Sequence, residues 1–397
     1  MRHAPAWVRF LREASGKALC LTLVPNMGSG PARKAPEFGR RARRGRLRLF
    51  LLGWHALLDA SIINLMSNGE RFRALRVRET AGEFVRAVEE CSAEDLPPGD
   101  VTIAVRYSSL NYKDALSAFG NRGVTREYPH TPGIDAAGVV VSDTSGSLSE
   151  GTEVLVHGHD LGANTWGGFS ELIRVPRDWV MPLPAGLSLR RAAAYGTAGF
   201  TAAQSVLELE EQGIGPESGE VLVTGASGGV GSIAVAVLGR LGYSVVGVSG
   251  KTGAGQRLRR FGAAQVIGRE EAVEQSGRPL LKGRWAGVVD TVGGEILSTA
   301  IRSTKYRGCV TACGNAASGE LPMTVYPFIL RAVKLVGIDS AHVPEDRRRA
   351  VWQRLAEPWA VTEALDTMTS ETDLDHLDYW ITVILSGGID GRILVHL

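Results

Sequence analysis

The chain has 397 residues, which is enough for two domains with substantial apolar cores. Apolar residues make up 44% of it and charged residues 22%, ordinary proportions for a globular protein. Its four cysteines are too few for a disulfide scaffold, and Cys309 and Cys313 are interpreted as two small buried residues. This cysteine content fits a reducing compartment, and we expect a cytoplasmic protein.

Basic residues are concentrated at the N-terminus. Residues 1–66 contain twelve Lys and Arg against three Asp and Glu, a formal charge of +9, whereas the whole chain carries +2. Residues 67–397 are therefore mildly acidic, and they offer no basic surface of the kind that binds nucleic acid.

Residues 1–70 form an extension without clear periodicity, and Pro, Gly and Arg dominate residues 26–48, a composition typical of disorder. Residues 47–66 are more apolar, but charged and polar side chains interrupt them, which makes a poor membrane span. The extension could be an arginine-rich presequence or an amphipathic surface-binding tail. We favour a plain disordered tail, or an over-extended reading frame whose true start is Met66, and expect residues 1–66 to be dispensable.

Short strands dominate the chain from Phe72 onward. Apolar and polar residues alternate in some runs, and turn-forming Gly, Pro, Ser and Asp separate others. We expect strands at residues 73–78, 101–107, 137–142, 153–156, 172–175 and 180–183. Many short strands with turns between them predict a small β-barrel-like domain. Residues 189–212 have a helical pattern and lead into the next unit.

A buried strand, Val221–Val223, is followed by a glycine-rich turn, a helix and a second strand, Val245–Val248. Within the turn, Gly228 would let backbone amides approach a pyrophosphate, and Gly231 would let the helix pack close to the strand. The N-terminus of the helix would then face the anion. The alternative is a tight turn without a ligand, but the strand-turn-helix context favours a dinucleotide site.

Strands and helices keep alternating after Lys251. We expect a basic helix at residues 255–261 and strands at residues 264–267, 287–290, 309–312 and 335–338. Beyond Pro344 a helix rich in arginine and tryptophan precedes a terminal strand, Arg392–His396. We expect this last part of the chain to return to the first domain.

Several motifs fall in the order typical of one family. They are SSLNYKD at residues 108–114, PGIDAAG at 132–138, WGG at 166–168, GTAGFT at 196–201, the glycine-rich turn, AGVVDTVGG at 286–294 and PFILRAVKLVGIDS at 327–340. From about Arg73 to Leu397 the chain resembles the medium-chain dehydrogenase/reductases. Within them it resembles the zinc-independent branch of acrylyl-CoA reductases and quinone-oxidoreductase-like proteins.

This resemblance implies an α/β fold that combines a GroES-like small β-barrel domain with a Rossmann doubly wound parallel sheet. We expect residues 71–195 and 340–397 to form the GroES-like substrate domain and residues 196–339 to form the Rossmann NADP-binding domain, after the extension of residues 1–70. The resemblance also suggests a homodimer. No nucleic-acid or membrane partner is expected.

The resemblance further implies a set of site residues. Tyr112 is the candidate catalytic residue and also a cofactor contact. Further cofactor contacts are expected at Thr201, Ser227, Gly228, Gly229, Val230, Ser249, Gly250, Lys251, Arg269, Asn315 and Leu335.

The cofactor expected at this site is NADPH. An NAD site usually has Asp or Glu about twenty residues after the glycine-rich turn, where it binds the ribose 2′-hydroxyl. The second strand ends instead in Ser249, Gly250 and Lys251, whose hydroxyl, backbone amide and ammonium suit a 2′-phosphate. Arg269, just past the third strand, could assist. The alternative interpretation is an ordinary polar turn.

No metal is expected. Zinc alcohol dehydrogenases place a His-Glu pair where this chain has Ile134 and Asp135, and their ligand cysteines have no equivalent here. A catalytic zinc needs three protein ligands, which the sequence does not supply. His157 and His159 are close in sequence, but such a pair without a third ligand is more often a surface feature than a metal site.

Without zinc to polarise a carbonyl, the chemistry should suit a conjugated double bond. A nicotinamide would supply hydride to the β-carbon of an enoyl thioester, and a proton would be added at the α-carbon. We predict NADPH-dependent reduction of acrylyl-CoA to propanoyl-CoA. The alternatives are an NADPH quinone or enone oxidoreductase and a nucleotide-binding protein without turnover.

Tyr112 could donate a hydrogen bond or a proton to the enolate, or it could merely pack against the nicotinamide and order its loop. Asn111 is expected to fix this loop or the cofactor ribose. Lys113 and Asp114 could pair with each other at the surface.

Overall fold

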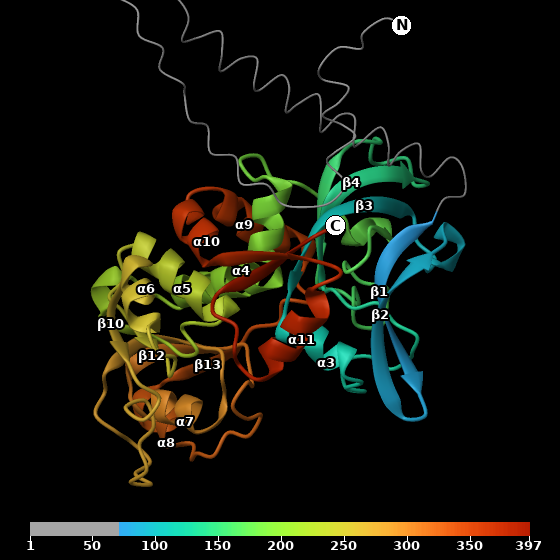
Figure 1. Cartoon of the computed structure of the whole chain (residues 1–397). Coiled ribbons are helices and arrows are strands. Elements are labelled where there is room, and N and C mark those ends of the chain that lie inside the picture. The colour runs from blue at the N-terminus through green and yellow to red at the C-terminus, as the bar shows by residue number, and fades with distance from the viewer. Residues whose placement is uncertain (1–70) are drawn as a thin grey trace, which may run out of the picture. The chain divides into compact units, whose positions relative to one another are not determined.

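The computed structural model describes residues 71–397 (Figure 1), so the interpretations of residues 1–70 lie outside its described part. The strands are β1 (Phe72–Thr80), β2 (Glu83–Cys91), β3 (Val101–Leu110), β4 (Asp135–Asp143), β5 (Glu153–His157), β6 (Leu172–Val175), β7 (Met181–Pro182), β8 (Val221–Val223), β9 (Val245–Val248), β10 (Ala263–Ile267), β11 (Trp285–Asp290), β12 (Thr304–Ala312), β13 (Lys334–Gly337), β14 (Thr369–Asp373) and β15 (Arg392–His396). The α-helices are α3 (Tyr112–Ala118), α4 (Leu189–Glu211), α5 (Gly229–Arg240), α6 (Ala254–Arg260), α7 (Gly294–Arg302), α8 (Tyr326–Arg331), α9 (Glu345–Ala356), α10 (Thr362–Met368) and α11 (Leu377–Leu385). None of the helices in residues 71–397 is long and apolar enough to cross a membrane.

The second half of the chain builds a six-stranded parallel sheet in the order β10-β9-β8-β11-β12-β13. Because β8 is its first strand in sequence, this is the order 3-2-1-4-5-6 of the doubly wound dinucleotide-binding folds. The chain reverses direction across the sheet between β8 and β11. That switch point is where such sheets bind their ligands, outside the carboxyl ends of the strands.

Both faces of this parallel sheet are covered, which explains the continuous apolar runs in its strands. Val221 and Val223 belong to the core cluster that contains the buried side chains of α4 and α5. Leu222, between them, belongs to a second cluster with Leu297 and Ile301 of α7. The period of two along β8 therefore assigns alternate residues to opposite faces.

The first half of the chain supplies most of a seven-stranded sheet, in which β14, β15, β3, β4, β5 and β7 follow one another and β6 also pairs with β3. The terminal strand β15 pairs antiparallel with β3, so that Ile393 faces Leu110. The end of the chain is thus hydrogen-bonded to a strand that lies nearly three hundred residues earlier. The hairpin β1–β2 forms a separate two-stranded sheet.

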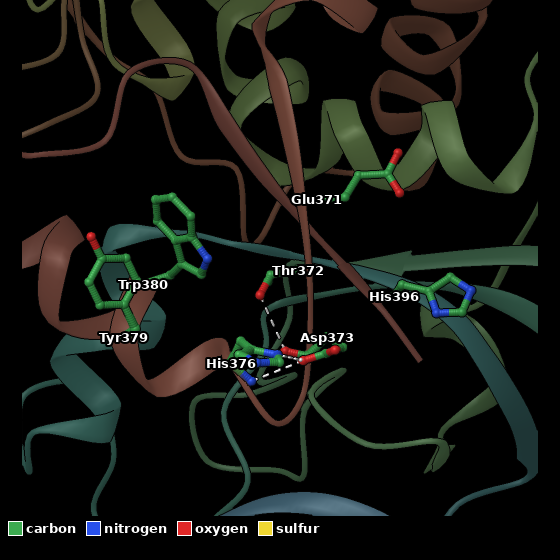
Figure 2. A pocket seen from close by; sticks show the side chains of 7 residues that line it. All are labelled: Glu371, Thr372, Asp373, His376, Tyr379, Trp380 and His396. Carbon is green, nitrogen blue, oxygen red and sulfur yellow. Dashed lines mark hydrogen bonds and ion pairs between the residues drawn. The ribbon is translucent and has the colours of Figure 1, made fainter. Parts of the chain in front are cut away.

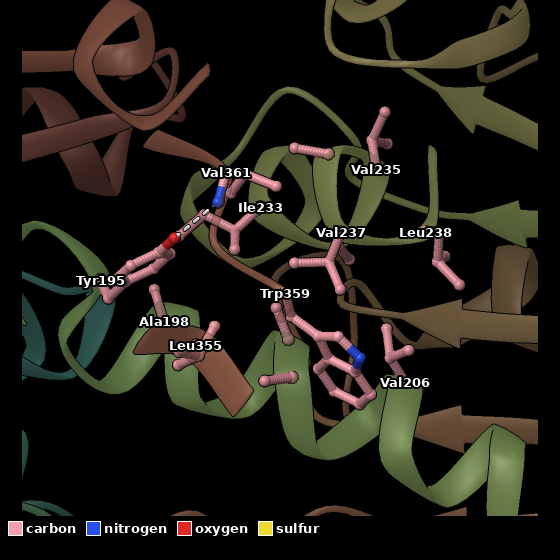
Figure 3. Packing of buried hydrophobic residues seen from close by; sticks show 14 of the residues in the cluster. Tyr195, Ala198, Val206, Ile233, Val235, Val237, Leu238, Leu355, Trp359 and Val361 are labelled. Carbon is pink, nitrogen blue, oxygen red and sulfur yellow. Dashed lines mark hydrogen bonds between the residues drawn. The ribbon is translucent and has the colours of Figure 1, made fainter. Parts of the chain in front are cut away.

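Helix α4 connects the two sheets and is buried over most of its length. Figure 3 shows how residues after α9 close over it, with Trp359 lying between α4 and α5. The hydroxyl of Tyr195 accepts a hydrogen bond from the backbone amide of Val361 at 3.0 Å. This polar contact inside the apolar cluster fixes the C-terminal helices against α4.

Candidate active site

The glycine-rich turn after β8 is shaped by two close approaches that only glycine permits. Gly225 has a φ of +56°, and a Cβ on it would lie 2.3 Å from Thr291 Oγ1. A Cβ on Gly231 would lie 2.3 Å from the carbonyl oxygen of Gly225. Helix α5 therefore starts directly against the end of β8, and its N-terminus is placed at the switch point of the sheet.

The two strands that flank the switch point are held together by buried hydrogen bonds. Thr224 Oγ1 donates to Asp290 Oδ1 at 2.7 Å, and the amide of Thr291 donates to Thr224 Oγ1 at 3.0 Å. The amide of Gly293 donates to Asp290 Oδ2 at 2.8 Å. Burial raises the pKa of Asp290, although these donors oppose the shift. The carboxyl end of β11 is thus fixed beside the glycine-rich turn.

The end of β9 also contacts the glycine-rich turn. Ser249 Oγ donates to Ser227 Oγ at 2.9 Å, and the amide of Lys251 donates to Ser249 Oγ at 3.2 Å. A Cβ on Gly250 would lie 2.7 Å from Arg269 Nε, so the side chain of Arg269 lies directly against the backbone of Gly250. The structure thereby brings together Ser227, Ser249, Gly250, Lys251 and Arg269, which the sequence assigned to one cofactor.

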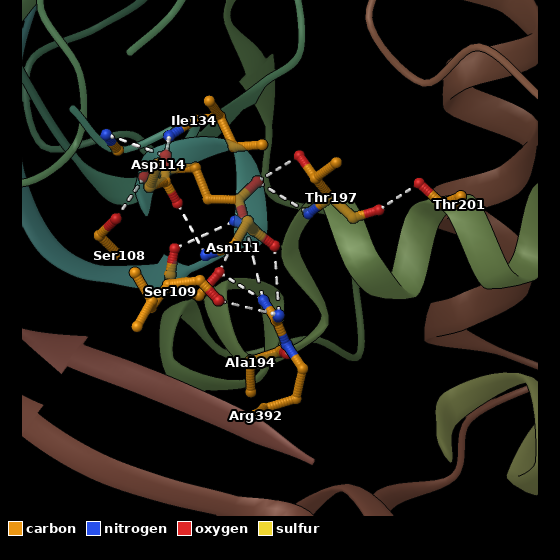
Figure 4. Close-up of polar contacts among 12 residues, drawn as sticks. Ser108, Ser109, Asn111, Asp114, Ile134, Ala194, Thr197, Thr201 and Arg392 are labelled. Atoms are coloured by element: carbon orange, nitrogen blue, oxygen red, sulfur yellow. Dashed lines mark hydrogen bonds and ion pairs between the residues drawn. The ribbon is translucent and has the colours of Figure 1, made fainter. Parts of the chain in front are cut away.

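A buried arginine, Arg392, lies between the glycine-rich turn and the SSLNYKD segment, and Figure 4 shows its hydrogen bonds to that segment. Arg392, at the start of β15, donates to Ser109 Oγ at 2.6 Å, to Asn111 Oδ1 at 3.2 Å and to the carbonyl oxygen of Ala194 at 2.9 Å. A Cβ on Gly229, the first residue of α5, would lie 3.1 Å from the same nitrogen that contacts Asn111. The start of α3 and the start of α5 therefore meet at one guanidinium.

Asp135 is the acceptor at the centre of this network. Its Oδ2 accepts hydrogen bonds from Ser109 Oγ and Asn111 Nδ2, both at 2.7 Å. Its Oδ1 accepts from the amide and the hydroxyl of Thr197, also at 2.7 Å. Gly196 has a φ of +48° and would carry a Cβ only 2.4 Å from Asp135 Oδ2, so helix α4 kinks there to admit the carboxylate.

Asp114 corrects a prediction made from the sequence. It does not pair with Lys113 at the surface, because its carboxylate is fully buried. It accepts hydrogen bonds from the amides of Asn111 at 2.7 Å, Gly133 at 3.1 Å and Ile134 at 2.8 Å. Burial and the charge of Asp135 raise the pKa of Asp114 to about 7, while these amides act in the opposite direction. Asp114 thus anchors the first turn of α3 from within.

Tyr112 is the first residue of α3, where the sequence suggested a loop. Its side chain is 39% exposed, and its hydroxyl has no hydrogen-bond partner within residues 71–397. The neighbouring Asn111 is buried and held by Asp135 and Arg392. The backbone at Tyr112 is therefore fixed, while its phenol is left available for a ligand.

The remaining predicted contacts differ in how closely they join this site. Thr201 follows Thr197 by one turn of α4 and donates its hydroxyl to the carbonyl oxygen of Thr197 at 2.7 Å. Asn315 is exposed in the loop after β12. Leu335 lies within the edge strand β13, opposite Val310, before the carboxyl end of the strand. No hydrogen bond or ion pair within residues 71–397 joins Asn315 or Leu335 to the other site residues, so their roles stay predictions.

His157 is buried, contrary to the surface position expected from the sequence. Its Nε2 lies 2.7 Å from the indole Nε1 of Trp352, which donates to it, and Arg348 packs beside it. Burial and the charge of Arg348 keep its pKa well below the usual range. The ring of His159 stacks on Trp179 at 5.0 Å between centroids. Within residues 71–397 no group of three His, Cys, Asp or Glu could hold a metal ion.

An open groove of about 560 Å³ lies elsewhere, along the edge strand β14 (Figure 2). It is lined by Glu371, Thr372, Asp373, His376, Tyr379, Trp380 and His396. Its acidic side chains are already paired, Glu371 with Arg190 and Asp373 with His376. None of the predicted site residues lines it, so the groove is separate from the candidate active site.

Sequence reasoning missed the residues that join the parts of the site. From the sequence, Asp135 is interpreted only as a residue that stands where zinc enzymes have part of a His-Glu pair. Arg392 is interpreted only as the first residue of a strand. One available signal was a single arginine that begins an otherwise apolar strand, because such a charge is buried only with partners. Its partners could not be named, since Asn111 lies 281 residues earlier in the chain.

Two family models match this chain. One described as "Alcohol dehydrogenase GroES-like domain" covers residues 97–185, and one described as "Zinc-binding dehydrogenase" covers residues 229–357. Together with the parallel sheet, these matches confirm the predicted combination of a GroES-like domain with a Rossmann sheet.

Individual proteins match over nearly their whole length. Acrylyl-CoA reductase AcuI of Ruegeria pomeroyi is 44% identical over 317 residues, 80% of this chain and 96% of that protein. The yhdH oxidoreductase of Salmonella enterica, crystallised with NADP, is 44% identical with a TM-score of 0.80 over 82% of this chain and 99% of its own. YhfP of Bacillus subtilis, provisionally named a quinone oxidoreductase and crystallised with NAD, is 45% identical with a TM-score of 0.80 over the same shares.

Proposed function

Because the chain belongs to the medium-chain dehydrogenase/reductase family, in the branch of acrylyl-CoA reductases and quinone-oxidoreductase-like proteins, we propose that it reduces the double bond of an enoyl thioester with NADPH. The preferred substrate in this proposal is acrylyl-CoA, and the product is propanoyl-CoA. The observation that carries it is the Arg392 network, which fixes the start of α3 with Tyr112 beside the start of α5.

The residues at the carboxyl edge of the parallel sheet fit a dinucleotide. Gly225 and Gly231 have no room for a side chain, so the turn brings the N-terminus of α5 close to the end of β8, where a pyrophosphate would bind. Ser249, Lys251 and Arg269 lie around the end of β9, where a 2′-phosphate would bind, and no carboxylate follows that strand directly. This arrangement supports NADPH rather than NADH, although the Bacillus subtilis relative was crystallised with NAD.

A zinc ion has no part in this proposal. Ile134 offers no ligand atom, and both oxygens of Asp135 accept two short hydrogen bonds each. His157 uses its Nε2 to accept a hydrogen bond from Trp352. The Asp135 oxygens and His157 Nε2 therefore already accept buried hydrogen bonds, and binding a metal ion would break these bonds.

The cofactor, when bound, supplies a hydride to the β-carbon of the conjugated system. The protein's own part is to hold the acyl group near Tyr112 and to stabilise negative charge on the thioester oxygen. The Tyr112 hydroxyl can donate a hydrogen bond to that oxygen or a proton to the α-carbon. Hydride and proton together saturate the double bond, and one NADPH is converted to NADP⁺ for each product formed.

A quinone or enone oxidoreductase is the second candidate, since the Bacillus subtilis relative carries a provisional name of that kind. A dinucleotide-binding protein without turnover is the third. The three differ in what makes the purified protein consume NADPH: acrylyl-CoA, a simple quinone, or neither. Absorbance at the reduced nicotinamide band, followed with each substrate in turn, separates them.

We also propose that the chain acts as a homodimer through α8 and β13. Within residues 71–397, strand β13 pairs with β12 alone and is therefore an edge of the parallel sheet. Ile329 and Leu330 on α8 are 67% and 58% exposed, and Leu335 on β13 is 37% exposed. A second copy of this edge and its apolar helix would cover both surfaces. Sedimentation should give a dimer for the wild type and a monomer for Ile329→Glu, and a wild-type monomer would contradict the proposal.

A cytoplasmic location belongs to the same proposal. Cys91, Cys309 and Cys313 are free thiols, and burial raises the pKa of each. Free thiols suit a reducing compartment. Fractionation of cells that produce the full chain checks this, and recovery in an oxidising compartment would contradict it.

A further inference from the structure

Two basic side chains pair with one carboxylate beside the end of β9, and a third basic side chain lies close to one of them. Lys251 Nζ lies 3.7 Å from Asp390 Oδ1, and a guanidinium nitrogen of Arg257 contacts Asp390 Oδ2. Arg269 lies across the backbone of Gly250, next to Lys251. The cluster therefore carries three positive charges and one negative charge, at the position where the 2′-phosphate is expected.

Asp390 reaches this position from the segment between α11 and β15. The backbone of that segment is anchored on both sides of Asp390, because Ile389 O accepts a hydrogen bond from Lys251 and the amide of Gly391 donates to Ser227 O at 2.9 Å. The carboxylate itself is less well bound. Its Oδ1 is buried and makes no hydrogen bond with the described residues.

The positive charges of this cluster favour an anion beside them. Burial lowers the pKa of the Lys251 ammonium, the charge of Asp390 opposes that shift, and the charges of Arg257 and Arg269 add to it. A phosphate monoester brings nearly two negative charges and several strong acceptors, whereas Asp390 brings one charge. The phosphate is thus the stronger partner for the same donors.

We propose that Asp390 is a specificity-determining residue, whose carboxylate occupies the anion position of the 2′-phosphate pocket in the cofactor-free protein and competes with the phosphate for Lys251 and Arg257. The inference rests on the proposed use of NADPH. In this proposal Arg257 is a further ligand of the 2′-phosphate. The carboxylate of Asp390 reduces the preference of the protein for NADPH over NADH. NADH, which has a 2′-hydroxyl, does not need to displace the carboxylate.

The simpler interpretation is an ion pair that only fastens the C-terminal segment to β9. Partly exposed ion pairs of this kind stabilise proteins little. If the ion pair has only this structural role, its removal should change the affinities for NADPH and NADH equally. Competition for the phosphate affects NADPH alone, so the two interpretations differ in the ratio of the two affinities.

Asp390→Asn in the full chain removes the charge and keeps the shape of the side chain. Dissociation constants are measured by calorimetry for NADPH, NADH and adenosine 2′,5′-bisphosphate, which carries the 2′-phosphate without a nicotinamide. We expect NADPH and the bisphosphate to bind about fivefold to tenfold more tightly than to the wild type, the order of one charge-charge interaction at about 4 Å that water screens. NADH should change less than twofold.

Glu210→Gln is the matched control, because Glu210 also pairs with one arginine, Arg354, and its side chain is 33% exposed against 32% for Asp390. It should leave all three affinities unchanged. Equal changes for NADPH and NADH in Asp390→Asn, or no tightening of NADPH, would overturn the inference. If Asp390→Asn does not fold, Asp390→Gln is measured in the same way.

The wild type separates this inference from the function on which it rests. If the wild type binds neither NADPH nor the bisphosphate, the proposed function fails. If the wild type binds both and removal of the carboxylate leaves the ratio of affinities unchanged, only the role of Asp390 fails. Arg257→Gln should weaken NADPH and the bisphosphate but not NADH, and an unchanged NADPH affinity would exclude Arg257 as a phosphate ligand.

Discussion

Replacing Arg392 by lysine tests whether one buried guanidinium holds the candidate active site together. The arginine donates to Ser109 Oγ, Asn111 Oδ1 and the carbonyl oxygens of Leu110 and Ala194, over distances of 2.6 to 3.3 Å. Lysine keeps the positive charge near Asp135 but lacks the planar fork, so it cannot satisfy acceptors on both sides at once.

The expected loss follows from these contacts. At least two of the four hydrogen bonds should be lost, and each leaves a buried acceptor without its donor, at about 1–2 kcal/mol apiece. The free energy of unfolding should therefore fall by about 2–4 kcal/mol in Arg392→Lys. Turnover should fall further than NADPH affinity does, because Asn111 loses the contact that fixes the start of α3.

Urea unfolding at neutral pH measures the first effect, and single-turnover kinetics with calorimetric NADPH binding measure the second. Arg354→Lys is the control, since its ion pair with Glu210 is partly exposed and should be worth less than about 1 kcal/mol. An Arg392→Lys protein as stable as the control, with unchanged turnover, would refute the reasoning that this residue organises the site.

Three further predictions concern the cofactor, the proton donor and acid stability. Tyr112→Phe should lower turnover about a hundredfold to a thousandfold with little change in NADPH affinity, and near-normal turnover would remove its catalytic role. Lys251→Glu should weaken NADPH binding much more than NADH binding, and equal losses would count against the 2′-phosphate assignment. Burial lowers the pKa of His130 to about 4, so the folded protein holds this ring neutral. The resulting contribution to folding stability is complete above pH 6.5 and is lost as the pH falls toward 4, because the unfolded chain takes up the proton first. Compared at pH 7.5 and pH 4.5, wild type should lose about 2.5 kcal/mol more stability than His130→Asn. Equal losses in the two proteins would show that His130 does not cause the acid sensitivity.

The sequence was sufficient where local patterns decide the structure. The strands β8, β9 and β15 were predicted with their observed bounds and a helix was predicted between β8 and β9, because apolar runs and glycine-rich turns are local signals. Strand β2 was not predicted. Charged residues such as Arg86 and Glu89 occupy much of it, and only its pairing with β1 makes it a strand.

The long-range contacts that hold the site together could not be predicted, because they join residues far apart in the sequence. Asp114 follows Lys113 in sequence, which suggests a surface ion pair, but two of its amide partners, Gly133 and Ile134, lie about twenty residues later in the chain. Arg392 and Asp390 lie at the far end of the chain from Asn111. Contacts of such separation depend on the closure of the whole fold, and no short pattern records them.

The most direct test of the proposed function is the consumption of NADPH by the purified full chain with acrylyl-CoA and, separately, with a simple quinone. We expect consumption with acrylyl-CoA only, and one propanoyl-CoA formed for each NADPH oxidised. Consumption with the quinone alone, or with neither compound, would contradict the proposal that the chain is an enoyl-thioester reductase.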